Sequence, residues 1–479
     1  MWSIIADVIL GLLVLQAILF IFLDKGSPGT KVSWLLIITI LPLLGIILYF
    51  MFGIHYRHRW YFLRRHRRMA EYVAENQEKL YGLLSDLDDL DKVKPEFRPL
   101  ARLMKRTTKG YVYGGNDVEI ITDGHRKLDL LKRDLRAAKK SIHVEYYHFG
   151  NDKTSREIKE ILMQKAGEGV DVRFLYENVA NFPIASIFYD SMTKAGVEIV
   201  RFTGPLYHLV NFVTRLNYRN HRKIVVIDGA IAYTGGMNIN EHYFFKWRDT
   251  HIRFTGPTVK ALQFLFVSSW IDGGGMLKGE PEEYFTEPAV EDSGPGLRDQ
   301  ILQVVADEPD SQWESIRMSY DWLLHNVQRY VWFQTPYFVP PDSLLEAMKS
   351  AALRGVDVRL MLPEVPDNIT TRWINKSYYE ELMEAGVKIF LRNEFIHSKT
   401  FVADDYLSCI GSANMDNRSM DLNYEVNTLF YSENAAAENK AIFEKDLGTC
   451  RELTVEEWEG RSWFSRFMEK FSRLFAAIL

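Results

Sequence analysis

Two long apolar runs open the chain, before the pattern turns to short alternating segments. Residues 4–23 are almost wholly apolar, and residues 34–53 form a second run of similar length. About 20 apolar residues are enough for a helix to cross the hydrocarbon core of a bilayer. A cleaved signal peptide would carry a basic segment before its apolar run, with no second run directly after it. We therefore predict a hairpin of two transmembrane helices over residues 1–54.

Arginines crowd the segment that follows the second run. Six of them lie between residues 57 and 68, whereas the loop between the two runs carries Lys25 and Lys31. Because basic flanks stay on the cytoplasmic side of a membrane, the chain after residue 54 is predicted to face the cytoplasm. Two interpretations of these arginines stay open: they set the topology alone, or they also attract anionic lipid head groups.

Beyond residue 106, strand-like and helix-like segments alternate, and they do so twice. In the first half, strand-like residues 141–149 and 170–176 flank a helical stretch. In the second half, residues 330–338 and 355–362 flank another. A strand, a helix and a strand in this order indicate parallel pairing through a crossover helix.

The two halves also match in sequence. Gly169-Val-Asp-Val-Arg173 returns as Gly355-Val-Asp-Val-Arg359. A repeat this long is typical of a duplicated domain. We predict an α/β fold with a duplicated α/β/α core and pseudo-twofold symmetry, preceded by two transmembrane helices. The predicted parts are the hairpin at 1–54, a basic juxtamembrane helical segment at 55–105, a first domain at 106–275, a linker at 276–298, a second domain at 299–450 and an amphipathic C-terminal helix at 451–479.

The C-terminal segment has large apolar residues at helical spacing, with Arg466, Lys470 and Arg473 between them. Aromatic and basic residues in this arrangement favour a helix that lies on an anionic membrane surface. A helix that packs on the core or on another subunit is the alternative, and the sequence does not decide between them.

Composition excludes several classes of protein. The formal net charge is −5 and the core has no long Lys/Arg tract, so nucleic acid is not an expected partner. The two cysteines, Cys409 and Cys450, are too few for a disulfide framework or a cysteine zinc site.

Each half carries one block of polar residues with the same spacing. The first block contains His221, Lys223, Asp228 and Asn238, and the second contains His397, Lys399, Asp404 and Asn414. Each asparagine follows its histidine by 17 residues (238 − 221 and 414 − 397). A histidine and a lysine two positions apart on a strand share a face. Two copies at equal spacing indicate a catalytic site, whereas a single copy would carry no weight.

The chemistry of this set suits a phosphate diester. Lysines and asparagines supply hydrogen-bond donors, and two histidines supply a nucleophile and a general acid. The pairs Gly235-Gly236 and Gly411-Ser412 are small, which allows the backbone to approach a ligand closely. No metal or other cofactor is expected, because the lysines can balance the charge of the phosphate.

With these blocks the chain resembles the phospholipase D superfamily, whose signature is HxKxxxxD in two copies. The finer resemblance is to bacterial cardiolipin synthases, in Arg219–Gly229, Trp247–His251, Gly411–Ser419 and Leu422–Asn427. It implies a bacterial inner-membrane enzyme that transfers a phosphatidyl group between two phosphatidylglycerols through a phosphohistidine and releases glycerol. It also implies phospholipid substrates and an anionic membrane surface as partners. A homo-oligomer stays open.

The resemblance also suggests roles for the block residues. We expect His221 to be the nucleophile and His397 the general acid, although the duplication leaves these two roles exchangeable. Lysines 223 and 399 and asparagines 238 and 414 are expected to bind the phosphate. Asp228 and Asp404 belong to the catalytic signature, and we interpret them as framework residues that brace the site.

A histidine that acts as nucleophile needs a carboxylate to hold its other nitrogen. Asp249 and Glu425 each follow the asparagine of their block by 11 residues (249 − 238 and 425 − 414). We predict that each of them orients a catalytic histidine. The alternative is that they are ordinary salt-bridge partners. One departure from the family is Glu177, where an aspartate was expected after the strand.

Two other functions compete with the synthase. A hydrolase of the same superfamily, acting on phospholipid or nucleic acid, would use the same histidines with water as acceptor. A non-catalytic lipid-binding scaffold would not need His, Lys and Asn in both copies. The predicted hairpin and the C-terminal helix favour a lipid acceptor.

Overall fold

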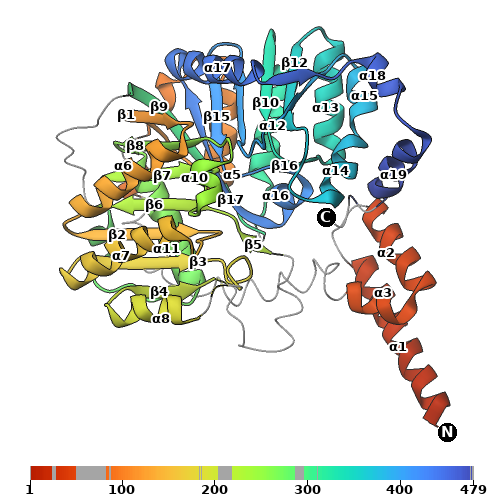
Figure 1. Ribbon diagram of the computed structural model, residues 1–479, viewed down its shortest axis with the longest axis horizontal. Helices are drawn as coiled ribbons and strands as arrows, with labels where there is room; N and C mark the ends of the chain where they lie inside the picture. Colours follow the sequence, from red (N-terminus) through yellow and green to blue (C-terminus); the bar gives the residue numbers. More distant parts are fainter. Residues whose placement is uncertain are drawn as a thin grey trace.

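The computed structural model describes residues 2–23, 28–49, 82–85, 88–182, 184, 186–202, 218–285, 296–309, 311–474 and 476. The arginines at 57–68 and most of the predicted juxtamembrane segment lie outside these residues. So do residues 286–295 of the predicted linker. A large α/β body holds most of the described chain, and a pair of N-terminal helical rods stands beside it (Figure 1).

The N-terminal apolar runs form the helices α1 (Trp2–Leu23), α2 (Pro28–Ile40) and α3 (Pro42–Leu48). The second run is divided because Pro42 stands at the start of α3, where its missing N–H and fixed φ suit a new helix. Among the helices of the described chain, none has both the length and the apolar character that a bilayer crossing requires. The two predicted transmembrane helices are therefore not supported by the described helices.

The first half builds seven sheet strands and the helices between them. Its elements are α5 (Arg98–Thr108), β1 (Val112–Ile121), α6 (Gly124–Ala137), β2 (Ser141–Tyr146), α7 (Lys153–Gly167), β3 (Asp171–Tyr176), α8 (Ser186–Lys194), β4 (Glu198–Arg201), β5 (Arg219–Asn220), β6 (Lys223–Ile227), β7 (Ile231–Gly235), α10 (Glu241–Phe245), β8 (His251–Thr255) and α11 (Val259–Asp272). The short β5 lies apart from these seven and pairs with a strand of the second half.

The second half repeats this order and adds elements at its end. They are β9 (Leu297–Asp307), α12 (Ser315–Asn326), β10 (Tyr330–Gln334), β11 (Phe338–Val339), α13 (Asp342–Leu353), β12 (Asp357–Pro363), α14 (Ile369–Lys376), α15 (Tyr379–Glu384), β13 (Lys388–Arg392), β14 (Thr400–Ala403), β15 (Leu407–Gly411), β16 (Met415–Asp416), α16 (Asn417–Asp421), β17 (Asn423–Tyr431), α17 (Glu433–Leu447), β18 (Cys450–Glu452), α18 (Val455–Glu459) and α19 (Trp463–Arg473). Strand β9 begins at Leu297, inside the predicted linker.

One continuous sheet joins the two halves. Its order is β18-β13-β12-β10-β14-β15-β17-β9-β1-β8-β7-β6-β2-β3-β4, and the order read outward from the antiparallel β1/β9 pair is the same on both sides as far as β4 and β13. The predicted crossovers are present, since β2 pairs in parallel with β3 and β10 with β12. The sheet therefore has the pseudo-twofold arrangement expected from the duplication.

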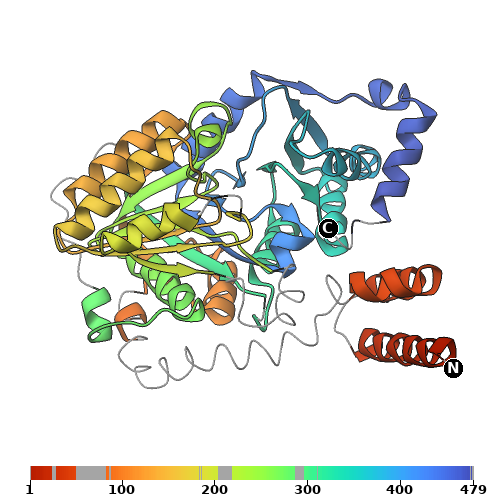
Figure 2. The same cartoon turned by 60° about the horizontal axis from the view of Figure 1, so that its bottom comes forward.

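Helices cover both faces of this sheet, and alternation along the strands explains why. In β6, Val225 and Ile227 belong to the apolar cluster of α6, α7 and α8, whereas Ile224 and Val226 belong to the cluster of α11. Successive side chains of a strand point to opposite faces, so an unbroken apolar strand is buried on both. The view in Figure 2 shows the layers on either side of the sheet.

Candidate active site

The backbone of each block histidine is held by the opposite half of the molecule. Strand β5 pairs in parallel with β17, and the His221 N–H donates to the Tyr424 carbonyl at 3.0 Å. In the other half-site, the His397 N–H donates to the Arg248 carbonyl at 2.7 Å. Tyr424 and Arg248 each directly precede one of the carboxylate residues found by spacing. The same pseudo-twofold contact therefore places both histidines.

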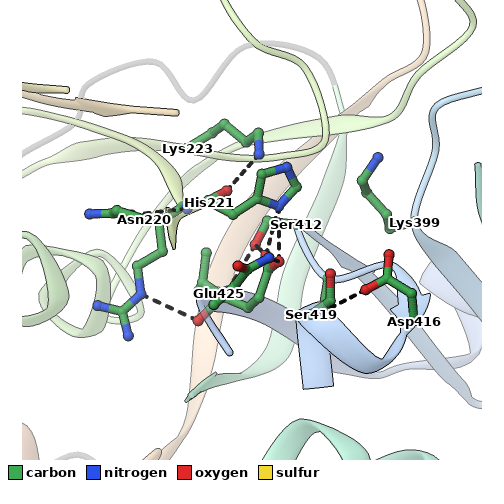
Figure 3. A network of polar contacts seen from close by, with 12 residues as sticks. Asn220, His221, Lys223, Lys399, Ser412, Asp416, Ser419 and Glu425 are labelled. Atoms are coloured by element: carbon green, nitrogen blue, oxygen red, sulfur yellow. Dashed lines mark hydrogen bonds and ion pairs between the residues drawn. The ribbon is translucent and has the colours of Figure 1, made fainter. Parts of the chain in front are cut away.

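The two carboxylates contact the histidines, and each reaches across to the other half. His221 Nδ1 lies 2.9 and 3.1 Å from the two oxygens of Glu425, and His397 Nδ1 lies 2.7 Å from Asp249 Oδ2. Both carboxylates are completely buried. With Nδ1 engaged, the Nε2 atom of each ring is the nitrogen left to meet a substrate. Figure 3 shows the carboxyl group of Glu425 beside the His221 ring.

Burial alone would raise the pKa of both carboxylates. The adjacent histidine and the buried lysines outweigh it, and they hold the pKa of Asp249 and of Glu425 below the usual range. Both groups are therefore anionic, and each can stabilise positive charge on the imidazole that it touches.

Glu425 has a supporting network that the sequence analysis missed. The Ser412 hydroxyl donates to Glu425 Oε2, and Asn423 Nδ2 donates to Oε1 at 3.2 Å. The Val426 N–H in turn donates to Ser412 Oγ at 2.9 Å. These contacts fix the carboxylate on the buried strand β17 (Figure 3). The Gly-Ser pair of the second block was the signal that could have located Ser412.

The Gly-Gly pair of the first block has a role that the sequence analysis did not predict. A Cβ atom at Gly236 would lie 2.1 Å from Asp249 Oδ1, and one at Gly235 would lie 2.7 Å from the Thr250 carbonyl. The glycines therefore make room for the carboxylate residue and its strand. The close approach that these glycines allow is to the protein's own Asp249, and their approach to a ligand stays a prediction.

Two buried lysines lie beside the histidines. Lys223 Nζ donates to the His221 carbonyl at 2.5 Å, and Lys399 Nζ lies 2.9 Å from His397 Nδ1. Burial lowers the pKa of Lys223 to about 7 and that of Lys399 to about 8, although both buried carboxylates oppose the shift. A bound phosphate would add negative charge and keep both ammonium groups protonated.

The charges of each half-site act on the histidine of the other. Burial lowers the pKa of His221 to about 4 and that of His397 to about 3. In addition, Lys399 lowers the pKa of His221, and Lys223 lowers that of His397. Both imidazoles are therefore neutral near pH 7 before substrate binds. A phosphate placed between them would raise both values.

Asn238 and Asn414 lie in the loops that follow β7 and β15. Asn238 Oδ1 accepts the His148 N–H at 3.2 Å. Within the described part of the chain, Asn238 Nδ2 and Asn414 Oδ1 are buried without a hydrogen-bond partner. Asn238 Nδ2 is a donor that suits a phosphate oxygen, whereas Asn414 Oδ1 is an acceptor, so Asn414 can bond phosphate only through its Nδ2 group.

The signature aspartates lie at the far end of the block strands from the histidines. Asp228 accepts the N–H groups of residues 139, 140 and 141 at 2.7 to 2.9 Å. Asp404 accepts those of residues 328, 329 and 330 at 2.8 to 3.1 Å. These bonds fix the beginnings of β2 and β10 beside the block strands. This geometry fits the bracing role that we expected of both aspartates.

Aromatic rings, of which the sequence analysis named only Trp247 as part of a family-like segment, enclose the two imidazoles. The ring centroid of Tyr147 lies 4.8 Å from that of His221, and those of Tyr243 and Trp247 lie 5.0 and 5.6 Å from that of His397. All three rings limit the water around the histidines. Only coordinates could reveal them, because their spacing does not repeat between the halves.

Glu177, the residue that departs from the family pattern, accepts two backbone hydrogen bonds. Its Oε2 atom accepts the Asn220 N–H at 2.9 Å, and Oε1 accepts the Val179 N–H at 3.1 Å. It thus connects the loop after β3 to the residue before His221.

Among the described residues, no group of three or more His, Cys, Asp or Glu side chains is placed to hold a metal ion.

Two family models match the chain. The model described as cardiolipin synthase, PLD-like domain, matches residues 131–270 and 322–447. The model described as phospholipase D-nuclease N-terminal matches residues 12–53. The first of these covers both histidine blocks and both carboxylates.

Known proteins match over nearly the full length. The cardiolipin synthase of Halalkalibacterium halodurans is 34% identical over 471 residues, which are 96% of this chain and 91% of that relative. The major cardiolipin synthase of Bacillus subtilis is 34% identical over 484 residues, which are 97% of each. Among solved structures, a phosphatidylserine synthase of Haemophilus influenzae covers 80% of this chain and 100% of its own, with a TM-score of 0.58 and 15% identity. This last likeness shows the fold.

Proposed function

The chain belongs to the bacterial cardiolipin synthases of the phospholipase D superfamily, and we propose that it converts two phosphatidylglycerols into one cardiolipin and one glycerol. The protein is a phosphatidyltransferase, and its fold is the α/β fold of that superfamily. The observation that carries the mechanism below is the crossed pairing of each buried histidine with a carboxylate of the other half.

In the first step, His221 Nε2 attacks the phosphorus of the donor lipid. The P–O bond to the glycerol head group breaks, and His397, which is protonated once the bound phosphate has raised its pKa, gives its Nε2 proton to the departing oxygen. The phosphatidyl group stays on His221 as a phosphohistidine. Two features support His221 as the nucleophile. Both oxygens of Glu425 face the His221 ring, which keeps this ring the more basic of the two. The side chain of His221 is also more exposed, at 11% against 5% for His397.

In the second step, the acceptor is the terminal hydroxyl of another phosphatidylglycerol. His397 takes the hydroxyl proton, the oxygen attacks phosphorus and the P–N bond breaks. Cardiolipin forms, and His221 is restored. We assign Lys223 and Lys399, with the two block asparagines, to the equatorial phosphate oxygens, whose charge they stabilise in both steps.

A product assay tests this function. The detergent-purified chain, given phosphatidylglycerol with a chelator present, is expected to form cardiolipin and glycerol in equal amounts. Radiolabelled head group and acyl chains follow the two products separately. If phosphatidic acid forms without cardiolipin, the protein is a hydrolase and not a synthase. If there is no turnover, a lipid-binding scaffold is favoured. Degradation of DNA or RNA in a parallel reaction under the same conditions would indicate a nuclease.

We further propose that the N-terminal helices hold the enzyme in the bacterial inner membrane as a multi-pass hairpin, with the catalytic body in the cytoplasm. Large apolar side chains of α1, α2 and α3 face outward, among them Leu12 at 62%, Leu36 at 56% and Leu43 at 65% exposure. Such a surface is unfavourable in water and favourable in lipid. The match of residues 12–53 to an N-terminal family model adds support.

Cysteine labelling in cells tests this topology. In a Cys450→Ser background, Gly29→Cys between the two apolar runs is expected to react with an impermeant maleimide in cells whose outer membrane has been opened. Val455→Cys, which is 52% exposed on the catalytic body, is expected to react only after the inner membrane is broken. Equal reactivity of both positions in intact spheroplasts would reject the arrangement. The native Cys409 is buried and can stay.

A further inference from the structure

Helix α19 (Trp463–Arg473) packs on the second half with its polar side inward. Glu469 and Ser472 are buried, at 3% and 9% exposure. Glu469 accepts from Arg461 Nε and from Ser465 Oγ, both at 2.9 Å. Arg473 donates to the Ser377 carbonyl at 3.1 Å. Arg461 also donates to Glu380 at 3.0 Å, and this contact and that of Arg473 fix the rotation of the helix against the second half.

The aromatic side of α19 faces outward. Its exposed residues, with their exposed fractions, are Trp463 (76%), Phe464 (58%), Phe467 (49%), Phe471 (45%) and Leu474 (67%). Three of the rings stack in a row, with centroids 5.6 Å apart from Trp463 to Phe467 and 5.9 Å apart from Phe467 to Phe471. We call these five residues the aromatic strip.

This orientation is the reverse of an ordinary surface helix. An amphipathic helix of a water-soluble body buries its apolar stripe and exposes its polar face. Here the body covers a carboxylate and a hydroxyl and leaves the aromatic strip in contact with solvent. Exposed aromatic area of this size is unfavourable in water, so the strip requires a second apolar phase.

We propose that α19 is a docking helix that lies in the plane of an anionic bilayer with the aromatic strip inserted among the lipids. Arg466 and Lys470 are exposed beside the strip, where they can meet lipid phosphates. Both views place α19 next to the apolar helix α2 (Figures 1 and 2). The two apolar surfaces therefore lie on one side of the catalytic body.

A second copy of the chain fits the strip less well. In a twofold contact the same patch faces itself, so Arg466 and Lys470 of one copy would approach those of the other. Like charges oppose such a contact, whereas anionic head groups are attracted to it. The charges of α19 thus favour lipid over a partner subunit.

Docking by α19 rests on the proposed function, because both proposed substrates are lipids of the bilayer and the enzyme must reach them there. A helix fixed to the second half by buried ionic contacts would set the angle of the catalytic body to the membrane surface. The binding measurement below does not depend on turnover, so failure of one idea is distinguishable from failure of the other.

Nitroxide accessibility in reconstituted vesicles tests the proposal. A label on Phe467→Cys, in a Cys450→Ser background, is expected to lose relaxation by a water-soluble nickel chelate and gain relaxation by dissolved oxygen in vesicles that contain phosphatidylglycerol. A label on Leu353→Cys, an isolated apolar residue with 73% exposure, is the matched control and is expected to show the opposite ratio.

Two further arms decide the partner. Vesicles of phosphatidylcholine alone, or the variant Arg466→Glu/Lys470→Glu in anionic vesicles, are expected to return the label at 467 toward the chelate. Equal chelate access at 467 and 353 in anionic vesicles would overturn the proposal. Dipolar broadening between labels at 467 of two chains, without oxygen access, would overturn it in favour of a subunit interface.

Discussion

Replacing His221 with alanine is expected to lower cardiolipin synthesis by about 10⁴-fold or more, and replacing His397 is expected to have an effect of similar size. The first change removes the atom that carries the phosphatidyl group, and the second removes the proton donor and acceptor of both steps. The measurement is initial rate in mixed micelles of phosphatidylglycerol. Because the two side chains act in the same steps, the double variant is expected to be no slower than the worse single variant.

A substrate with a good leaving group separates the two roles. Phosphatidyl-p-nitrophenol needs no protonation of its leaving oxygen, because nitrophenolate is already stable as an anion. His397→Ala is expected to release one equivalent of nitrophenolate and then stall as a phosphohistidine, since the second step still lacks its base. His221→Ala is expected to release none. The reverse result would exchange the roles of the two histidines, and a burst from neither variant would remove the covalent scheme.

The equal spacings within the two halves predicted histidines and carboxylates that the structure brings into contact. The distance of 17 residues from histidine to asparagine and of 11 from asparagine to carboxylate repeats in both halves, and the strands that carry them pair as the order of segments indicated. Periodicity works here because a duplicated domain keeps its internal register. It also located the two strand–helix–strand units correctly.

The crossed pairing could not be found in this way. Spacing within one half says nothing about which half supplies the partner of a histidine. That choice depends on β5 lying against β17, which brings His221 to Glu425, and on residue 248 lying against the other histidine loop. These are long-range contacts between short segments, and they carry no periodic signal.

Three other differences have local causes. Pro42 inside the second apolar run was a visible signal for a new helix, and α3 begins there. The two glycines of the first block accommodate Asp249, which becomes apparent only when the carboxylate is placed. In α19 the periodicity predicted an amphipathic helix, but it could not tell that the polar side packs inward around Glu469.

Replacing Glu425 with glutamine is expected to lower turnover by about 10²–10⁴-fold while the protein stays folded. Glutamine keeps the shape and removes the charge, so the His221 ring loses the anion that stabilises its positive form. A melting temperature close to that of the unmodified enzyme is the check on folding, since a buried charge network is disturbed. Near-normal turnover of the folded variant would show Glu425 to be an ordinary ion-pair partner.

The pH profile of kcat/KM gives this variant a signature that a structural defect would not produce. In the free enzyme the acid limb follows His221, which must be neutral to attack. Burial brings the pKa of this ring to about 4, and Glu425 opposes that shift. The neutral replacement therefore lowers the pKa of His221, and the acid limb is expected to move to lower pH. Ser412→Ala is the matched control: it removes a hydrogen bond to the carboxylate but keeps the charge, so we expect a loss of roughly tenfold or less with the acid limb in place.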